Sequence, residues 1–451
     1  MLLKPIRAFL SYTFLLLLLT DCGKQQTLQA LFQKSTPHDT YARRLRQAGL
    51  DQTALGRDWL AAADRALHDS LVVTLPFKET GLFRADRATA AAYRYSVRTG
   101  ETVRISLKLS DGTDAHVFLD AFELSPDHNT PRLLASADTA DLSFSYVAED
   151  NQQHLLRVQP ELLRNGRYTL SIRREPSLGF PVLGKNDAAV GSFWGMERDG
   201  GARRHEGIDI FAKRGTPAIA AAPGLITRTG VTKLGGNVVW LADAEHGQHL
   251  YYAHLDKQLV QPGQVVRVGD TLGLVGNTGN ARTTSPHLHF GIYRSGQGAV
   301  DPLPFVRHAD TAPAAPRTAP ERLGQWVRVR EKRTDLRRSP SAHGNTLAGL
   351  AHDTPLLVVG SQADWYRVER PDGRVGYVAA RAVVPAGSTP LRRESLSATA
   401  DVYSQPNLKA IPLDTLPART SVAVLGKFAG FRLVRSEGGV VGWLVPTGIK
   451  S

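Results

Sequence analysis

The sequence predicts a mainly β, multidomain protein made of an N-terminal helical segment, a β-sandwich, a second β-sheet domain and two small all-β units. Its 451 residues exceed a single compact domain, because folded units usually hold roughly 100–200 residues. The 41 Gly and 26 Pro supply the turns that many short strands need. Collagen-like, coiled-coil and wholly disordered classes are excluded, since 42% hydrophobic and 22% charged residues are an ordinary globular composition.

The amino end carries the features of an export signal. Lys4 and Arg7 precede an apolar run over residues 8–20, which is shorter than the ~20 residues of a membrane-spanning helix. Cys22, the only cysteine, follows in the sequence LTDC, which resembles the lipobox of bacterial lipoproteins. The resemblance implies a signal peptide over residues 1–22, lipidation of Cys22, and a membrane-anchored place in the cell envelope facing the periplasm or the exterior. An ordinary secretory signal with an incidental cysteine is the alternative.

Two segments of different pattern follow the signal. Residues 23–80 predict a helical segment, because apolar residues recur three and four positions apart in a stretch rich in Ala, Leu and Arg. Residues 81–178 change to short alternating runs such as TVRISLKLSDG and GRYTLSIRRE, which predict an antiparallel β-sandwich. This part resembles the pre-peptidase sandwiches of secreted bacterial proteases. We expect a spacer or a carbohydrate-facing module there, or a unit that only packs.

The charge of the chain restricts its partners without choosing among them. The 55 Lys and Arg against 42 Asp and Glu give a net charge of +13, which favours residence near anionic polymers such as cell wall, lipid headgroups or nucleic acid. The basic residues are dispersed and no recognition motif accompanies them, so nucleic acid is not an expected partner.

Histidines cluster in the middle of the chain, where six of the 14 fall between His205 and His289. In the run PHLHFGIY, His287 and His289 are two residues apart. A strand would therefore point both imidazoles to one face, while Leu288 and the other apolar residues pack into the other face. Upstream, HEGID places Asp209 four residues after His205, on a loop that enters a strand.

These residue types suit a catalytic metal. Two histidine nitrogens and one carboxylate oxygen can hold Zn²⁺ with a fourth position for water. Such a metal acidifies its water and polarises a peptide carbonyl, and amide hydrolysis needs both effects. In LYYAHLDK, we expect His254 on the same strand face as Leu250 and Tyr252, near the metal, where it can take a proton or steady an oxyanion.

The order of these motifs resembles a known family. HEGID, GNVVWLADAEHGQHLYYAHL, VQPGQVVRVGDTLGLVGNTG and SPHLHFGIY follow one another within residues 179–308, and this order resembles the lysostaphin-type (LytM-type) zinc metallopeptidases, which are peptidoglycan endopeptidases. The resemblance implies a β-sheet peptidase domain with one Zn²⁺ per chain. The site residues that it implies are the zinc ligands His205, Asp209 and His289, the unligated catalytic pair His254 and His287, and the candidate substrate contacts Trp194 and Tyr252.

The carboxyl third holds a linker and an internal repeat. Residues 309–321 are rich in Pro and Ala and predict a semi-extended linker. Residues 322–386 and 387–451 match at a fixed offset of 66 positions, as in Gly360 and Gly426, so they predict two copies of one small all-β unit.

The first copy contains ADWYRVERPDGRVGYVAARAV, which resembles bacterial SH3-like domains, so the pair is expected to be two small SH3-like β-barrels. Such modules often hold cell-wall peptides in exposed grooves, and Trp365 and Tyr377 are candidates to line one. The alternative is that these aromatic side chains fill a core too small to do without them.

These features together predict an exported zinc metalloendopeptidase that hydrolyses the peptide crosslinks of peptidoglycan, with the SH3-like pair holding it near its substrate. Two alternatives stay open. A non-catalytic wall-binding scaffold that activates another hydrolase would lack metal ligands, and a secreted protease would cut Gly-rich proteins in solution.

Overall fold

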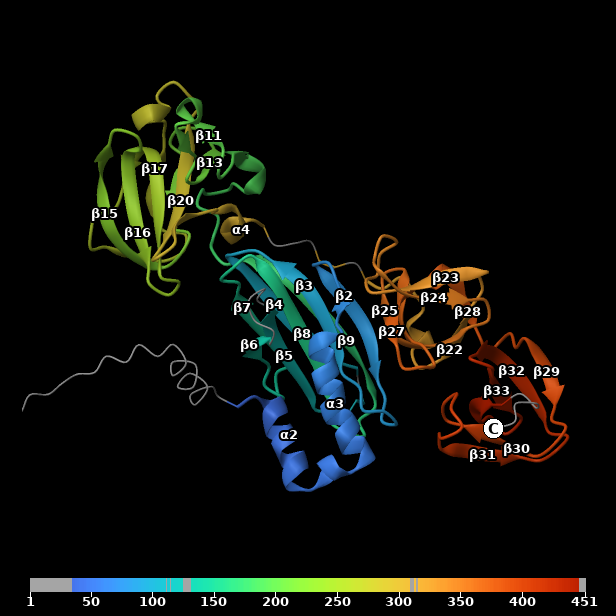
Figure 1. Ribbon diagram of the computed structural model, residues 1–451. Helices are drawn as coiled ribbons and strands as arrows, with labels where there is room; N and C mark the ends of the chain where they lie inside the picture. The colour runs from blue at the N-terminus through green and yellow to red at the C-terminus, as the bar shows by residue number, and fades with distance from the viewer. Residues whose placement is uncertain are drawn as a thin grey trace, which may run out of the picture.

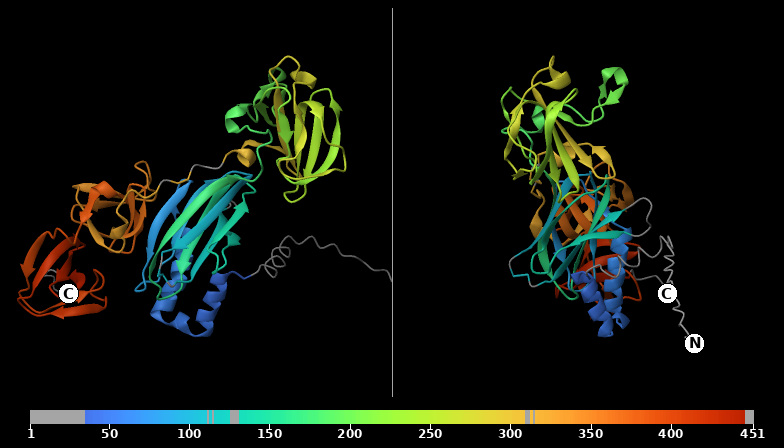
Figure 2. Two further views of the ribbon diagram at one scale, coloured as in Figure 1. Left: turned by 180° about the vertical axis from the view of Figure 1, so that it is seen from behind. Right: turned by 90° about the vertical axis from the view of Figure 1, so that its left-hand side faces the viewer.

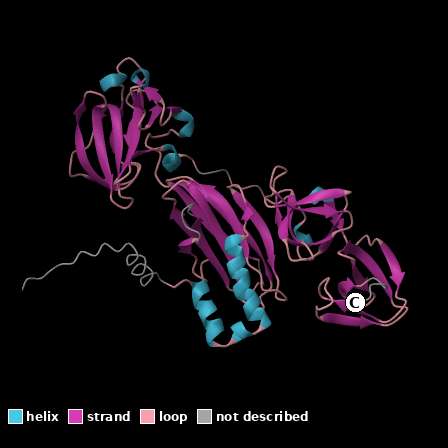
Figure 3. Cartoon of the chain, viewed as in Figure 1, coloured by secondary structure: helices cyan, strands magenta, loops and turns pink. Residues whose placement is uncertain are grey.

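The chain folds into several β units that follow one another from the amino end to the carboxyl end (Figure 1). The mainly β fold class and the helices near the amino end are as predicted (Figure 3). The domain that carries the histidine motifs lies at one end of the sandwich, and the first repeat lies beside one sandwich edge (Figures 1 and 2). Cys22 and the predicted signal peptide lie outside the described residues. The computed structural model describes residues 35–110, 112–113, 115–124, 131–308, 312–313 and 315–445.

Two helices cover one outer face of the sandwich. The first begins with a capping box, in which the side chains of Thr36 and Asp39 each accept from the other residue's backbone N–H. The second buries Trp59, whose indole donates to Pro160 O at 2.8 Å and ties the helix to the sheet. The helical part ends at His68, so the sandwich starts earlier than the predicted boundary. These elements are α2 (Pro37–Gln47), η1 (Leu50–Gln52) and α3 (Ala54–His68). None of the helices in the described part of the chain is long and apolar enough to cross a membrane.

The sandwich packs two sheets with their apolar faces together. Ile105 and Leu170 from one sheet and Leu119 and Leu156 from the other are fully buried in one core. In spatial order, the first sheet contains β1 (Leu71–Val72), β3 (Ala91–Val97), β8 (Gln152–Pro160), β5 (Val117–Leu124) and β6 (Arg132–Ser136), and the second contains β2 (Phe77–Phe83), β9 (Gly166–Pro176), β4 (Glu101–Leu109) and β7 (Ser143–Val147).

The histidine domain, residues 179–308, is built on one large sheet whose main path is antiparallel. Leu288, Phe290 and Ile292 are fully buried on one face of its central strand, which confirms the predicted alternation around the two histidines. The strands of the main path are β10 (Val190–Ser192), β13 (Ile208–Phe211), β20 (His287–Arg294), β17 (Gln248–Gln258), β16 (Gly236–Asp243), β15 (Gly224–Thr232) and β18 (Val265–Val266), with β14 (Pro217–Ile219), β19 (Thr271–Val275) and β21 (Gly298–Val300) beside it. The shorter elements are η2 (Asp187–Ala189), the hairpin β11 (Glu197–Arg198), η3 (Asp199–Gly201) and β12 (Arg203–Arg204), η4 (Gly279–Ala281) and α4 (Leu303–Val306).

The two repeats share strand order and irregularities. A register shift between Val358 and Gly360 recurs between Val424 and Gly426, at the same offset of 66 positions that the sequence shows. Repeat 1 (residues 322–386) holds η5 (Pro320–Arg322) at its start, then β22 (Trp326–Val329), β23 (Arg333–Arg337), β24 (Thr346–Ala351), β25 (Pro355–Gln362), β26 (Trp365–Glu369), β27 (Val375–Ala379), η6 (Ala380–Ala382) and β28 (Val383–Pro385). Repeat 2 (from residue 387) holds β29 (Arg392–Ser395), β30 (Ala400–Tyr403), β31 (Pro412–Leu416), β32 (Ser421–Phe428), β33 (Phe431–Ser436) and β34 (Val441–Leu444).

Repeat 1 is joined to the sandwich by a shared sheet. Strand β25 pairs with β2, with Thr80 opposite Ser361, so one sheet runs through both units. Behind this pairing, Arg367 Nε donates to the buried Glu79 carboxylate at 2.8 Å, and Tyr377 OH donates to it at 2.9 Å. Tyr377 has no exposed surface, so the prediction that it contacts substrate is wrong: its hydroxyl is used to hold the two units together.

Candidate active site

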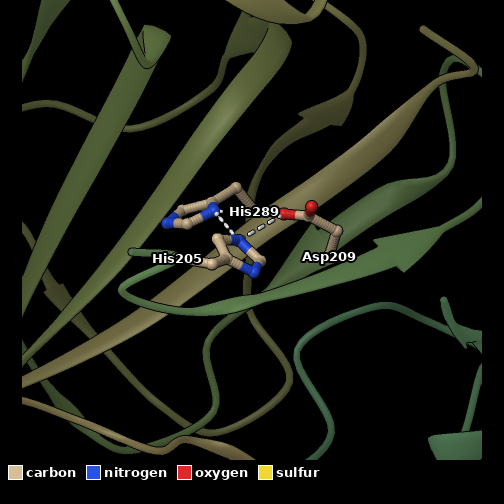
Figure 4. Close-up of side chains that lie close together, drawn as sticks. All are labelled: His205, Asp209 and His289. Carbon is tan, nitrogen blue, oxygen red and sulfur yellow. Dashed lines mark hydrogen bonds and ion pairs between the residues drawn. The ribbon is translucent and has the colours of Figure 1, made fainter. Parts of the chain in front are cut away.

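Three side chains from two segments of the chain converge on one point (Figure 4). His205 Nε2 lies 3.0 Å from Asp209 Oδ1 and 2.9 Å from His289 Nδ1, and His289 Nδ1 lies 3.1 Å from the same carboxylate oxygen. All three side chains are buried or nearly so. The sequence brings them together because Asp209 on β13 stands directly opposite His289 on β20 in the antiparallel register.

The loop before β13 delivers His205. Its backbone N–H donates to Met196 O at 2.8 Å, and its own carbonyl accepts from Gly195 N at 2.9 Å. Gly207 lets the loop pass close to His289, because a Cβ there would lie 2.7 Å from His289 Cε1 and 2.6 Å from Phe290 O. Glycine at residue 207 is therefore a requirement of the site.

A second layer of contacts orients two of the three side chains. His205 Nδ1 donates to Phe193 O at 2.9 Å, which fixes its proton on Nδ1 and leaves the Nε2 lone pair facing the site. Arg198 Nη2 donates to Asp209 Oδ2 at 3.0 Å, so the other carboxylate oxygen is turned to the imidazoles. Sequence reasoning missed Arg198, because nothing in its local pattern separates it from the neighbouring arginines.

The charge state of the cluster fits a cation. Burial alone would raise the pKa of Asp209, but hydrogen bonds and charge from His205 and His289 hold that pKa well below its usual range, so the carboxylate is charged. Burial lowers the pKa of His289 and favours its neutral ring. Three lone-pair atoms within 3.1 Å of one another need a positive charge among them, either a shared proton or a metal ion. Two nitrogens and one oxygen at such spacing are the donor set of a catalytic zinc site, whose ligands bind at about 2.0–2.2 Å.

Two more histidines lie beside the cluster, and each carries its ring proton on Nδ1. His254 Nδ1 donates to Thr278 O at 2.9 Å, and His287 Nδ1 donates to Ser285 O at 2.8 Å. Each ring therefore keeps an unprotonated Nε2, and that of His287 lies 3.9 Å from Asp209 Oδ1. The two ring centroids are 5.0 Å apart. Burial, with the neighbouring His289 and His287, lowers the pKa of His254 to about 4.

A β-bulge places His254, and it corrects one prediction. His254 has a φ of 61°, its N–H donates to Gly235 O at 2.7 Å, and the β16–β17 register shifts beside it. The extra residue reverses the alternation, so His254 does not share a face with Tyr252. Tyr252 is fully buried in the core and its hydroxyl accepts from Ala221 N at 2.9 Å. The prediction that Tyr252 contacts substrate is therefore wrong.

The preceding residue, Tyr251, lies on the site face. Its ring centroid is 5.9 Å from that of His289 and 4.5 Å from that of Trp240, which in turn lies 5.2 Å from Tyr293. All three aromatic side chains are partly exposed and form a wall beside the metal ligands. Trp194 is also partly exposed and follows Phe193, whose carbonyl binds His205, so it stays a candidate contact at the rim.

Comparison with known proteins agrees with this geometry. Residues 203–302 match the family described as Peptidase family M23, and residues 330–385 match the family described as Bacterial SH3 domain. The chain is 34% identical over 139 residues to the L-Ala–D-Glu endopeptidase of Bacillus subtilis, which covers 28% of this chain and 42% of that protein. It is 38% identical over 109 residues to the glycyl-glycine endopeptidase ALE-1 of Staphylococcus capitis, covering 23% and 30%.

A third relative is the DD-carboxypeptidase/endopeptidase Mpg of Neisseria meningitidis, 40% identical over 115 residues, covering 24% of this chain and 26% of that protein. The chain spans less than half the length of each of these three relatives. The similarity therefore describes domains and not whole proteins. Residues 203–302, which hold the three converging side chains and both neighbouring histidines, are a peptidase family M23 domain, and residues 330–385 are a bacterial SH3 domain.

Proposed function

We propose that the protein is an exported zinc metalloendopeptidase that hydrolyses peptide bonds in bacterial peptidoglycan. The observation that carries this proposal is the convergence of His205, Asp209 and His289, with His254 and His287 beside them. A wall-binding scaffold would not need these groups, and all five are present. The three relatives are named for different bonds, so we propose the substrate class and not the bond.

His205, Asp209 and His289 would hold the zinc, and the two other histidines would handle protons. When bound, zinc would polarise the peptide carbonyl and acidify a water molecule. His254 and His287 present unprotonated Nε2 atoms to the site, so either can accept a proton and return it to the leaving amine. Burial lowers the pKa of His254 to about 4, so its ring is neutral at pH 7.

The aromatic wall would position the substrate. Tyr251 stands between His289 and Trp240, and Tyr293 OH donates to Glu206 Oε2 at 3.3 Å at the far end of the wall. A peptide strand lying on this face would meet flat apolar surface and then reach the metal ligands. Partial exposure of these rings allows contact without a change in fold.

We also propose a place in the cell envelope. The signal-like amino end and Cys22 support export and a lipid anchor. The net charge of +13 supports residence beside an anionic wall polymer, and the SH3 domain supports retention near it.

Digestion of purified sacculi tests the enzymatic proposal. The mature chain should release soluble fragments whose masses identify the bond, and a chelator or His289→Ala should stop the release. His249→Ala is the matched control, because His249 is an exposed histidine opposite Tyr293, four positions along β20 from His289. Release that continues in His289→Ala would contradict the mechanism, and a zinc-free protein without activity would favour the scaffold.

A further inference from the structure

We infer that the junction between the sandwich and repeat 1 holds a second binding site, for a neutral sugar chain such as the glycan strand of peptidoglycan. The choice of that polymer rests on the proposed function. A cavity of about 430 Å³ lies at this junction, away from the metal site. Ligand pockets are commonly about 300–1,000 Å³ and favour domain junctions.

The walls of this junction cavity are fixed before any ligand binds. They come from both units that share the sheet: Leu82 lies at the end of β2 in the sandwich, and Leu357 lies on β25 in repeat 1. The pairing of β2 with β25 and the buried Glu79–Arg367 ion pair hold the two sides together. A preformed site binds without the entropy loss of ordering its own walls.

The lining combines one aromatic platform with polar groups. Trp326 is partly exposed and lines the cavity, while its ring also packs edge-on against Trp443 of repeat 2, with centroids 5.9 Å apart. Arg84, Asp86 and Asn165 supply hydrogen-bonding groups around it. An indole ring beside amide, carboxylate and guanidinium groups suits a sugar ring, which has an apolar C–H face and hydroxyl or acetamido groups at its edges.

The charge of the lining points to a neutral ligand. Arg84 Nε donates to Asp86 Oδ1 at 2.8 Å, and a second contact joins the same two side chains, so their charges cancel. Among the cavity's lining residues no other side chain is charged. A polyanion or a peptide carboxylate would find no free cation here, whereas an uncharged sugar needs none.

A glycine keeps one wall thin. Gly324 lines the cavity with a φ of +82°, and a Cβ built there would lie 3.0 Å from Leu82 Cδ2. A larger residue at 324 would be strained and would press on the sandwich side of the cavity.

Isothermal titration calorimetry tests the inference. The full chain is titrated with a β-1,4-linked N-acetylglucosamine hexamer. Trp326→Ala should weaken binding at least about tenfold, since a stacked aromatic anchor contributes on the order of one decade or more. Because Trp326 also packs on repeat 2, the exposed Asn165→Ala provides a second variant that leaves the packing intact, and it should weaken binding about threefold or more. Asn345→Ala is the control, being an exposed asparagine of repeat 1 outside the cavity lining, and should bind as wild type.

The outcomes separate this inference from the proposed function. The inference is overturned if wild type does not bind the hexamer, or if both cavity variants bind it as tightly as wild type. Binding of a peptide with an L-Ala–D-Glu bond at this cavity, in place of the sugar, also overturns it. His289→Ala should bind the hexamer with unchanged affinity. A chain that binds the hexamer but releases nothing from sacculi would refute the proposed function and keep the cavity assignment.

Discussion

Replacing Glu79 by Ala should release repeat 1 from the sandwich. Glu79 is fully buried and accepts from Tyr93 OH at 2.7 Å, Arg367 Nε at 2.8 Å and Tyr377 OH at 2.9 Å. Without it, the Arg367 guanidinium is left inside the junction with only neutral acceptors, Tyr168 OH and a backbone carbonyl. Removing one partner of a buried ion pair destabilises a protein by about 3–5 kcal/mol.

Two further variants show which part of this effect comes from the charge. Glu79→Gln keeps the shape and one oxygen acceptor but loses the negative charge, so its destabilisation should be smaller than that of Glu79→Ala. Arg317→Ala removes an ion pair with Asp364 whose side chains are 70% and 62% exposed, and it should leave stability unchanged.

Urea unfolding followed by intrinsic fluorescence measures these differences. At a slope of about 3 kcal/mol per M, a loss of 3–5 kcal/mol lowers the midpoint of the sandwich transition by about 1–2 M. Glu79→Ala should also expose the junction to limited proteolysis. A midpoint for Glu79→Ala equal to that of Arg317→Ala would mean that water reaches Glu79 in solution, and the shared sheet would be refuted.

Arg198→Met should weaken zinc binding about 10–100-fold, because the Asp209 carboxylate is no longer held in place, and Arg198→Lys should recover part of the affinity. Competition with a chromogenic chelator measures the zinc affinity. Equal affinities of Arg198→Met and wild type would count against an orienting role for Arg198. Gly207→Ala should lower zinc content and activity together, because its Cβ would lie 2.6 Å from Phe290 O, and metal analysis of the purified variant checks this. Burial lowers the pKa of His154 to about 4, so the folded sandwich prefers a neutral ring there. The contribution of neutral His154 to the stability of the sandwich should be fully present above about pH 6.5. It should fall by about 2–3 kcal/mol towards pH 4, where the unfolded chain binds a proton that the folded chain does not. Urea midpoints at pH 7 and pH 4.5 should shift less in His154→Gln than in wild type, and parallel shifts would refute this assignment.

Features with a local period could be predicted from the sequence. The H-x-H spacing on a strand predicts that His287 and His289 share a face while Leu288 is buried, and β20 has this arrangement. The repeat offset likewise predicts two units with the same strands, because equal spacing of turns and apolar residues specifies equal pairing.

The face of His254 could not be predicted, because it depends on one extra residue in a strand. Alternation along LYYAHL puts His254 on the face of Tyr252, but the bulge moves His254 to the opposite face, where Tyr251 already lies by regular alternation. The run itself gives no sign of the bulge, which is specified by the partner strand through Gly235 O.

Contacts between distant parts of the chain were also beyond sequence reasoning. Local pattern predicts a strand at Tyr377 but puts Glu79 at the end of the helical segment, whereas both residues lie on strands of one sheet, β27 and β2. Nothing near Glu79 marks it as buried, since a charged residue in an alternating strand normally faces water. Its burial follows only from the arrival of Arg367, and that pairing depends on how two domains dock.

The two repeats dock on their preceding units through equivalent positions with different chemistry. Tyr377 and Arg367 of repeat 1 hold the Glu79 carboxylate, whereas Trp443 and Leu433, which stand 66 positions later, are buried in an apolar contact with Trp326 of repeat 1. The same face of the unit is thus used twice, first with a buried ion pair and then with aromatic packing. The aromatic residue at this equivalent position, Tyr377 in repeat 1 and Trp443 in repeat 2, is therefore explained by docking within the chain. Any ligand of the repeats must use other surfaces, and Trp326, the partly exposed ring that two junctions share, provides one.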